Sequence, residues 1–490
     1  MFINQKALHG IPNHRFPFAI PVLVCVATLM TAKNVAAAER EVAVRPGDDV
    51  QALVQKSPEN TTFRFKPGVY RQQSIRPKDG DSFIGEPGAV LSGAMLVSDF
   101  TRQGRYWVAK VHAERSDGHG QCQEDAPGCV LPEDVFFDDH PLRHEPNADA
   151  ATAGKWHMDY DGDALYLADD PTGHKVEISL TRNAFQSAAS NVTIHGLVVE
   201  KYANPAQRGA IHVAAGPNSP GENWKIEDCE VRWNHGVGIR FGNASKVLHN
   251  NVHDNGQLGI AGSGKDALVE GNEIAHNNYA GYKPNWEAGG TKFTFTEGLV
   301  VRNNFVHDNN GPGLWTDIDN VNTIFEDNRT ARNKSAGIAT EISFGAIIRN
   351  NTVDDDGVNT NHPNDRPWYG AGILVIASSK VEVYGNHVTN CMNGIVAVQG
   401  NRGASKRLGT PYEVRDLYVH DNVITQKDGF AAALTADRTF GDAPFRDWNN
   451  RFVHNTYHLA NPGGKYFEWG GNRRNPGEWR GSGQDREGSW

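Results

Sequence analysis

Apolar and polar positions repeat in a fixed order along most of the chain. From about residue 186, an apolar run is followed by a polar pair containing asparagine, one more apolar residue, a polar corner, and Gly-Ile or Gly-Leu, as in KVLHNNVHDNGQLGI and TIFEDNRTARNKSAGI. Alignment of the copies places asparagines in register, with spacings of 22, 32, 24, 23, 35 and 36, at Asn250, Asn272, Asn304, Asn328, Asn351, Asn386 and Asn422. A basic period of 22 to 24 residues with short apolar runs predicts a solenoid of parallel strands.

The repeat also excludes the other solenoid classes. β-Branched runs and Gly/Asn corners argue against helical repeats, and the fixed leucines of leucine-rich repeats are missing. In-register asparagines at one corner would stack into a ladder of side-chain amides. With these features, residues 186–460 resemble the right-handed parallel β-helix (pectin-lyase-like) superfamily of secreted carbohydrate-active proteins. The resemblance implies an all-β fold.

The flanking segments suggest how the solenoid begins and ends. Residues 1–38 run from basic to apolar to small residues, which is typical of a cleaved signal peptide, with a buried N-terminal helix as the alternative. Residues 39–100 are expected to form a capping helix and the first coils, and residues 101–185 a β-rich insertion of short hairpins. The parallel β-helix with its groove would span residues 186–460. The Trp-rich tail, 461–490, would close the far end or stack on sugars.

Charge and cysteines narrow the choice of partner and compartment. Removal of Lys6, Arg15 and Lys33 with the signal peptide would change the net charge from −10 to −13, which argues against a nucleic-acid partner. A polyanionic substrate is disfavoured too, unless a local basic groove overrides the average. Cys122 and Cys129 bracket the short loop CQEDAPGC, and we expect a disulfide in a secreted or periplasmic protein without a membrane span.

Two carboxylates stand at equivalent positions of neighbouring coils. In residues 313–319, GLWTDID, strand alternation with Leu314 and Ile318 inward places Trp315, Asp317 and Asp319 outward. Asp317 lies 13 residues after a ladder asparagine, as does Glu341 in the next coil, so the two acids should be exposed neighbours. Such a pair repels and needs a compensating group.

The preceding coil and two long loops supply candidate partners for the acids. Lys292 falls at the matching position one coil earlier and is the expected cation, with Trp286 and Glu287 beside it. The coils after residues 351 and 386 also expand, and long loops over one stretch of a solenoid commonly wall a groove. Their aromatic and charged residues suit sugar faces and hydroxyls: Asp365, Arg366, Trp368, Tyr369 and Arg402. Arg240 and Lys265 lie at outer positions of earlier coils and either bind substrate or solvate the sheet.

The acid pair predicts glycoside hydrolysis, with Asp317 and Glu341 as acid and nucleophile or base, and with Asp319 binding substrate or positioning water. Repulsion would raise the pKa of one member, which would then be the acid. The partner would be a polysaccharide or oligosaccharide, bound by a monomer.

Two other functions compete with hydrolysis. Glu287 and Lys292 resemble the calcium-ligand Glu and catalytic Lys of chondroitinase-B-type lyases, which implies elimination or epimerisation with calcium as cofactor. The chain departs from that family at Asp317, where the resemblance would require an arginine. The third alternative is a non-catalytic glycan-binding solenoid, with the acids as a structural calcium site or a solvated patch.

Overall fold

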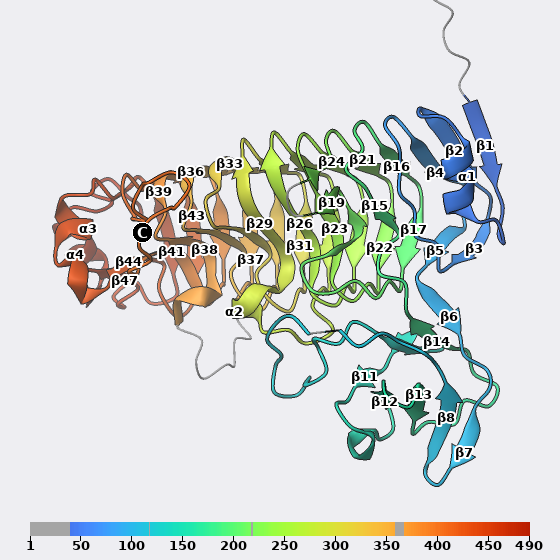
Figure 1. The fold of residues 1–490 in the computed structure, drawn as a ribbon. Helices are drawn as coiled ribbons and strands as arrows, with labels where there is room; N and C mark the ends of the chain where they lie inside the picture. Colours follow the sequence, from blue (N-terminus) through green and yellow to red (C-terminus); the bar gives the residue numbers. More distant parts are fainter. Residues whose placement is uncertain (1–39, 117, 217–218, 358–366) are drawn as a thin grey trace, which may run out of the picture. The chain divides into compact units, whose positions relative to one another are not determined.

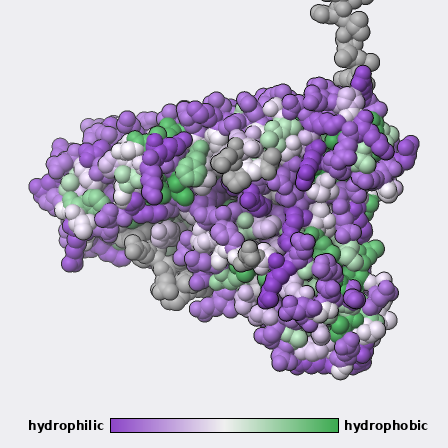
Figure 2. Space-filling model, viewed as in Figure 1, coloured by the Kyte–Doolittle hydropathy of each residue, from purple (hydrophilic) through white to green (hydrophobic). Residues whose placement is uncertain are grey.

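The computed structural model describes residues 40–116, 118–216, 219–357 and 367–490. The expected signal peptide, 1–38, lies outside these residues. The described strands stack along one axis in three rows, and each regular coil contributes one short strand to each row (Figure 1). None of the described helices is long and apolar enough to cross a membrane. On the face shown in Figure 2, the surface is mostly hydrophilic, with scattered hydrophobic patches.

The first row is parallel throughout. Its strands are β1 (Arg40–Val44), β2 (Thr61–Phe65), β4 (Ser82–Gly85), β16 (Thr193–His195), β21 (Lys225–Glu227), β24 (Lys246–Leu248), β27 (Leu268–Glu270), β30 (Val300–Arg302), β33 (Val321–Glu326), β36 (Phe344–Arg349), β39 (Ser379–Tyr384), β42 (Tyr418–His420) and β45 (Arg451–Val453).

The second row carries the candidate site on its outer face and joins the first row in one 25-stranded sheet. Its strands are β15 (Phe185–Gln186), β18 (Gly209–His212), β23 (Val237–Phe241), β26 (Leu258–Lys265), β29 (Gly289–Glu297), β32 (Leu314–Asp317), β35 (Ile338–Glu341), β38 (Ala371–Ile376), β41 (Asn393–Gln399), β44 (Ala432–Ala436), β47 (Phe467–Trp469) and the antiparallel β48 (Asn472–Arg474).

The third row is a separate 12-stranded parallel sheet. Its strands are β3 (Gly68–Arg71), β5 (Ala89–Ser92), β17 (Val198–Glu200), β22 (Glu230–Arg232), β25 (Asn251–His253), β28 (Glu273–Ala275), β31 (Phe305–His307), β34 (Arg329–Ala331), β37 (Thr352–Asp354), β40 (His387–Thr389), β43 (Val423–Gln426) and β46 (Thr456–Leu459).

Alternation along the strands builds the core between the rows. In the first row the middle residues of successive strands pair in register and are almost fully buried: Ile226, Val247, Val269, Val301, Phe325, Ile348, Val383, Val419 and Phe452. Each coil thus places an apolar side chain on its equivalent in the next coil, and β-branched and aromatic residues suit this pleated packing. The predicted all-β solenoid is confirmed.

The predicted asparagine ladder is present and fully buried. The Asn304 side-chain nitrogen donates to Asn328 Oδ1 at 2.9 Å and to the Val269 carbonyl at 3.0 Å, and the other ladder asparagines are bonded alike. A second ladder, not predicted, follows the next corner and ends on a carboxylate: Asn234, Asn255, Asn277, Asn309, Asn333 and Asp356. These amides satisfy corner carbonyls that would otherwise be buried without a donor.

Helices and the tail cover both ends of the core. α1 (Val50–Lys56) starts at Asp49, whose carboxylate accepts from the Ala52 amide at 2.9 Å, and it buries Val50 and Val54. At the other end, Asp485 accepts from the last ladder amide, Asn455, at 2.9 Å, and from Trp479 Nε1 at 2.9 Å. Trp479 is fully buried on α4 (Pro476–Gly481), and α3 (Ala443–Arg446) lies at the same end (Figure 1).

Strands between the N-terminal coils form two small sheets with a core of their own, around Trp156, Leu165, Leu167 and Ile178. They are β6 (Ala94–Leu96), β7 (Thr101–Gln103), β8 (Tyr106–Lys110), β9 (Val135–Phe137), β10 (His140–Pro141), β11 (Arg143–His144), β12 (Lys155–Asp159), β13 (Ala164–Leu167) and β14 (Val176–Ser179), with the 3₁₀ turn η1 (Ala148–Ala150). A hairpin of β19 (Ala214–Gly216) and β20 (Ser219–Pro220) and the 3₁₀ turns η2 (Pro367–Gly370) and η3 (Arg438–Phe440) complete the described elements. Cys122 and Cys129 are joined by a disulfide.

The ladder should be energetically important at each rung. Asn304→Ala should lower the free energy of unfolding by about 1–3 kcal/mol, because it leaves the buried Asn272 amide and Val269 carbonyl without this partner. Chemical denaturation measures the loss. Asn251→Ala, at an exposed position of β25, is the control and should change stability little; equal stability of both variants would contradict the role of the ladder.

The end of the second ladder predicts a pH-dependent stability. Burial raises the pKa of Asp356 from its usual 3.8 to about 7. The folded chain therefore binds a proton that the unfolded chain has already lost, and this contribution to stability declines as pH rises from about 4 to about 7. Asp356→Asn, which needs no proton, should flatten that decline in urea denaturation midpoints. An unchanged pH dependence would rule out Asp356 as its source.

Candidate active site

Three neighbouring strands of the second row, β29, β32 and β35, bring the predicted residues together. Asp317 at the end of β32 pairs directly with Glu341 at the end of β35, and Trp315 pairs with Ala339. On the other side, β32 pairs with β29, where Phe293 is opposite Thr316, so that Lys292 lies beside Trp315 on the outer face. The equal offsets from the ladder thus produce neighbouring acids, as the sequence predicts.

The outer faces of these strands form the floor of a cavity of about 240 Å³. Its charged residues are Glu287, Lys292, Asp317, Glu341 and Arg402. Aromatic and apolar side chains complete the lining: Pro284, Trp286, Pro312, Trp315, Ala336, Ala339, Tyr369, Leu374 and Ile376, with the polar Asn285 and Ser335. An acid pair in an aromatic-lined cavity is an arrangement suited to binding and cleaving a sugar.

Each acid of the pair is held by a different cation. Lys292 Nζ lies 2.8 Å from Asp317 Oδ2 and 3.0 Å from Glu287 Oε1, and 4.1 Å above the Trp315 ring. Arg402 Nη1 donates to Glu341 Oε1. Lys292 is only 5% exposed, so its ion pairs are shielded from solvent. The two cations balance the repulsion of the stacked carboxylates.

Burial is the main influence on Asp317. It raises the pKa of this carboxyl from 3.8 to about 6; Lys292 opposes the rise, and the Glu341 charge adds to it. Oδ2 is fixed by Lys292, whereas Oδ1 is buried and has no hydrogen-bond partner in the described part of the chain. Asp317 therefore has one carboxylate oxygen, Oδ2, bound to Lys292 and one, Oδ1, without a partner among the described residues.

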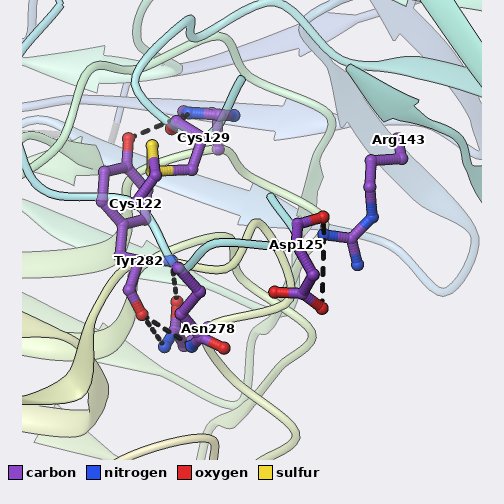
Figure 3. The surroundings of a disulfide bond; sticks show 8 residues. Cys122, Asp125, Cys129, Arg143, Asn278 and Tyr282 are labelled. Carbon is purple, nitrogen blue, oxygen red and sulfur yellow. Dashed lines mark hydrogen bonds and ion pairs between the residues drawn. A yellow bond between two sulfur atoms is a disulfide. The ribbon is translucent and has the colours of Figure 1, made fainter. Parts of the chain in front are cut away.

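The disulfide loop supports the wall of the cavity. Cys122 pairs with Tyr282 in an antiparallel bridge, and Gln123 Nε2 donates to the Tyr282 carbonyl at 2.9 Å. The Asn278 side chain also donates to this carbonyl, at 2.8 Å (Figure 3). Tyr282 in turn stacks on Trp286, with ring centroids 5.8 Å apart. α2 (Pro284–Glu287), which carries Trp286 and Glu287, begins two residues after Tyr282, with proline in its first turn.

The acids are not exposed, which corrects the sequence prediction. Asp317 and Glu341 are each 6% accessible. Strand alternation does direct them away from the solenoid core, but a second apolar cluster covers the outer face, including Trp315, Leu374 and Tyr412. Leu374 and Ile376 were not predicted as lining residues, although the uninterrupted apolar run AGILVI signals a strand covered on both faces.

Asp319 does not share the outer face with Asp317, and that expectation was wrong. β32 ends at Asp317, and Ile318 and Asp319 adopt positive φ angles of 64° and 57°. This turn breaks the alternation, so Ile318 packs against the outer cluster instead of the core. The Asp319 carboxylate accepts from the Tyr412 hydroxyl at 2.6 Å, and its carbonyl accepts from Arg407. It anchors the loop of residues 400–412 and does not line the cavity.

The other expected groove residues divide into two groups. Trp286, Glu287, Trp315, Tyr369 and Arg402 line the cavity. Asp365 and Arg366 lie outside the described residues, as does the side chain of Trp368.

Glu287 does not fit the predicted calcium ligand. Its Oε1 pairs with Lys292, and its Oε2 accepts from Gln207 Nε2. Both carboxylate oxygens thus face hydrogen-bond donors, whereas calcium binds oxygens that are free to coordinate.

The fold can be placed among known proteins. A family model described as right handed beta helix region matches residues 210–364. The chain is a right-handed parallel β-helix. A solved complex of XylC with xylose superimposes with a TM-score of 0.66 and 15% identity, covering 85% of this β-helix and 83% of XylC.

Other solved β-helices are more distant. The A-module of the mannuronan C-5 epimerase AlgE4 of Azotobacter vinelandii has a TM-score of 0.48 and 13% identity, covering 87% of this chain and 92% of its own. A mannuronic acid specific family 6 lyase from human gut microbiota has a TM-score of 0.46 and 10% identity, with 91% and 93% covered. No curated protein sequence matches the chain.

The ion pair with Lys292 should control Asp317. Lys292→Met removes the cation that lowers this pKa, so the pKa of Asp317 should rise above about 6. A carboxyl-carbon NMR titration measures the change. Lys265→Met, which removes an exposed cation from β26, serves as the control and should leave the titration unchanged. A pKa that stays at about 6 in Lys292→Met would contradict the proposed electrostatics.

Proposed function

We propose that this β-helix is a glycoside hydrolase whose catalytic pair is Asp317 and Glu341. The observation that carries the proposal is that the two carboxylates are directly paired across neighbouring strands, share one cavity and are each held by a separate cation. Glycosidases need two carboxyl groups beside one bond: one protonates the leaving oxygen, and the other attacks or activates water. Buried tryptophan and tyrosine faces supply the apolar contacts that sugar rings require.

The environments of Asp317 and Glu341 suggest which of them donates the proton and which is the nucleophile or base. Asp317 is the member of the pair whose pKa is raised, to about 6, so it is the better proton donor and acts as the general acid on the leaving oxygen. Its Oδ1, which has no partner among the described residues, can carry that proton. Glu341, which forms an ion pair with Arg402, then attacks the anomeric carbon or activates water. In this mechanism Lys292 holds and balances charge and takes no proton.

Elimination or epimerisation is the second candidate, and the contacts of Lys292 count against it. A lysine base needs a free lone pair near the substrate, whereas Lys292 Nζ is engaged by Asp317 and Glu287. The carboxylate of Asp317 would also repel a uronate at the reacting position.

The place of action follows from the chain's chemistry. We infer that the protein works outside the cytoplasm, in the periplasm or beyond the cell. The basic, apolar and small-residue order of residues 1–38 and the disulfide between Cys122 and Cys129 support an oxidising destination.

Asp317→Asn and Glu341→Gln should each lower kcat/KM by at least about 10³-fold, because each removes one of the two required carboxyl groups. Nitrophenyl glycosides, beginning with xylosides because the XylC structure contains xylose, measure the rate, and sugar release from an oligosaccharide panel measures cleavage. Azide should restore turnover of a Glu341→Gly variant if this residue is the nucleophile.

The control for these variants is Asp327→Asn, an exposed acid of the same coil outside the cavity, which should keep full activity. Thermal unfolding shows whether the variants are folded. Full activity in either cavity variant would remove that residue from the mechanism. Unsaturated uronate products would assign elimination instead.

A further inference from the structure

A second cavity, of about 550 Å³, lies on the same outer face, over β18, β23, β26 and β29. Its distinctive residues are Arg208, His212, Arg240 and Phe295, and we refer to this group as the arginine pocket. The proposed hydrolysis uses none of these side chains.

The arginine pocket carries two guanidinium charges, and among the described residues the one carboxylate whose charge acts on Arg240, Glu287, forms no ion pair with it. Arg240 is half-buried next to Arg208, and in the described ranges no carboxylate lies within ion-pair distance of either guanidinium. Two other half-buried arginines in the β-helix are paired: Arg232 binds Glu200 at 2.9 Å, and Arg349 binds Glu326 at 2.5 Å. Burial and the neighbouring Arg208 charge lower the pKa of Arg240, and Glu287 opposes this only in part, so the buried charge of Arg240 costs free energy. An anionic ligand would offset that cost.

His212 adds a neutral hydrogen-bond donor. Burial lowers its pKa to about 3, and the charges of Arg240 and Arg208 act in the same direction, so the ring is uncharged at neutral pH. Its Nδ1 accepts from the Gly209 amide at 3.0 Å, which leaves the proton on Nε2. Two guanidinium groups and one neutral N–H match a charged sugar that also carries hydroxyl groups.

Phe295 gives the pocket an aromatic face. The side chain is 45% exposed, and its backbone has a φ of 55°, a left-handed conformation that is unfavourable for a bulky residue. Its amide donates to the Ile318 carbonyl at 2.9 Å, which fixes the turn. A strained, exposed aromatic ring at the edge of a cavity is a suitable surface for stacking a sugar ring.

The two cavities are adjacent. Arg240 pairs with Ala261, and Ala261 pairs with Lys292, so Arg240 stands two strands, about 10 Å, from the lysine of the catalytic cavity. Gln207, which lines the arginine pocket, donates to Glu287, which lines the catalytic cavity. One oligosaccharide running across the strands would therefore reach both.

We propose that the arginine pocket binds a negatively charged sugar residue of the same chain whose glycosidic bond is cleaved beside Asp317 and Glu341. The charge would be a uronate carboxylate or a sulfate ester, since a guanidinium binds either through paired hydrogen bonds. The proposal extends the glycoside hydrolase function, but binding in this pocket does not require bond cleavage. It gives the acidic chain a local site for an anionic substrate despite its net charge of −10.

The test measures binding to the full-length Asp317→Asn protein by titration calorimetry. The ligands are trigalacturonate, its uncharged methyl ester and a sulfated galactose trisaccharide. We expect one of the charged ligands to bind at least tenfold more tightly than the ester, with an affinity that falls as salt rises. Preference for trigalacturonate identifies a carboxylate, and preference for the sulfated ligand a sulfate ester. Equal binding of all three, or no binding, would overturn the proposal.

Variants then locate the binding. Arg240→Gln should abolish the preference for charge, whereas Lys265→Gln, which removes an exposed cation outside the pocket, should retain it. Phe295→Asn should weaken binding of charged and uncharged ligands alike while leaving the melting temperature equal or higher, because asparagine tolerates the left-handed backbone. Unchanged preference in Arg240→Gln would place the anion elsewhere and overturn the assignment. Cleavage of neutral oligosaccharides by the parent enzyme without any preference for charge would contradict anion binding in the arginine pocket. It would not contradict the proposed hydrolase function.

Discussion

The lateral register of the coils is the constraint on which the structure depends. Backbone hydrogen bonds between parallel strands fix it, and the buried amide ladders reinforce it at two corners of successive coils. Because side chains at equal offsets from the ladder then occupy equal positions on neighbouring strands, a single residue step would exchange the inner and outer faces. The site is therefore a direct consequence of register: Asp317 can meet Glu341 only while Asn304, Asn328 and Asn351 remain aligned.

The electrostatics of the site depend on the loops and apolar side chains that shield the outer face of the second row from water. Two stacked carboxylates on an open sheet would be hydrated and weakly coupled. Here the loops and the outer apolar cluster exclude water, which strengthens the repulsion between the acids and also the attraction to Lys292 and Arg402. The same exclusion sets the proton affinity of Asp317 near neutrality, where a carboxyl group is useful in catalysis.

The sequence was sufficient for the fold and for the relation between the two acids, because both follow from a period that is written in the repeat. It correctly brought Lys292 to Asp317 for the same reason. It failed at Asp319, because strand alternation holds only while the backbone stays extended, and a left-handed turn begins at Ile318. It also missed the covering of the acids, the second ladder and the arginine pocket. The second ladder was readable from the repeat, because its asparagines lie five residues after those of the first ladder. The covering of the acids and the arginine pocket depend instead on loops and on positions such as Arg208, outside the repeat.

The clasp between Gln123 and Tyr282 joins residues 159 positions apart, whereas each coil contacts chiefly its immediate neighbours. The stack can therefore assemble step by step from local contacts, but the wall that carries Trp286 is braced only when a segment from an early hairpin region meets a coil completed much later. The wall of the cavity would then form later than the coils beside it, and an oxidising environment would help to hold it through the disulfide between Cys122 and Cys129. The stacked coils and the cavity wall that carries Trp286 would thus form at different stages of folding.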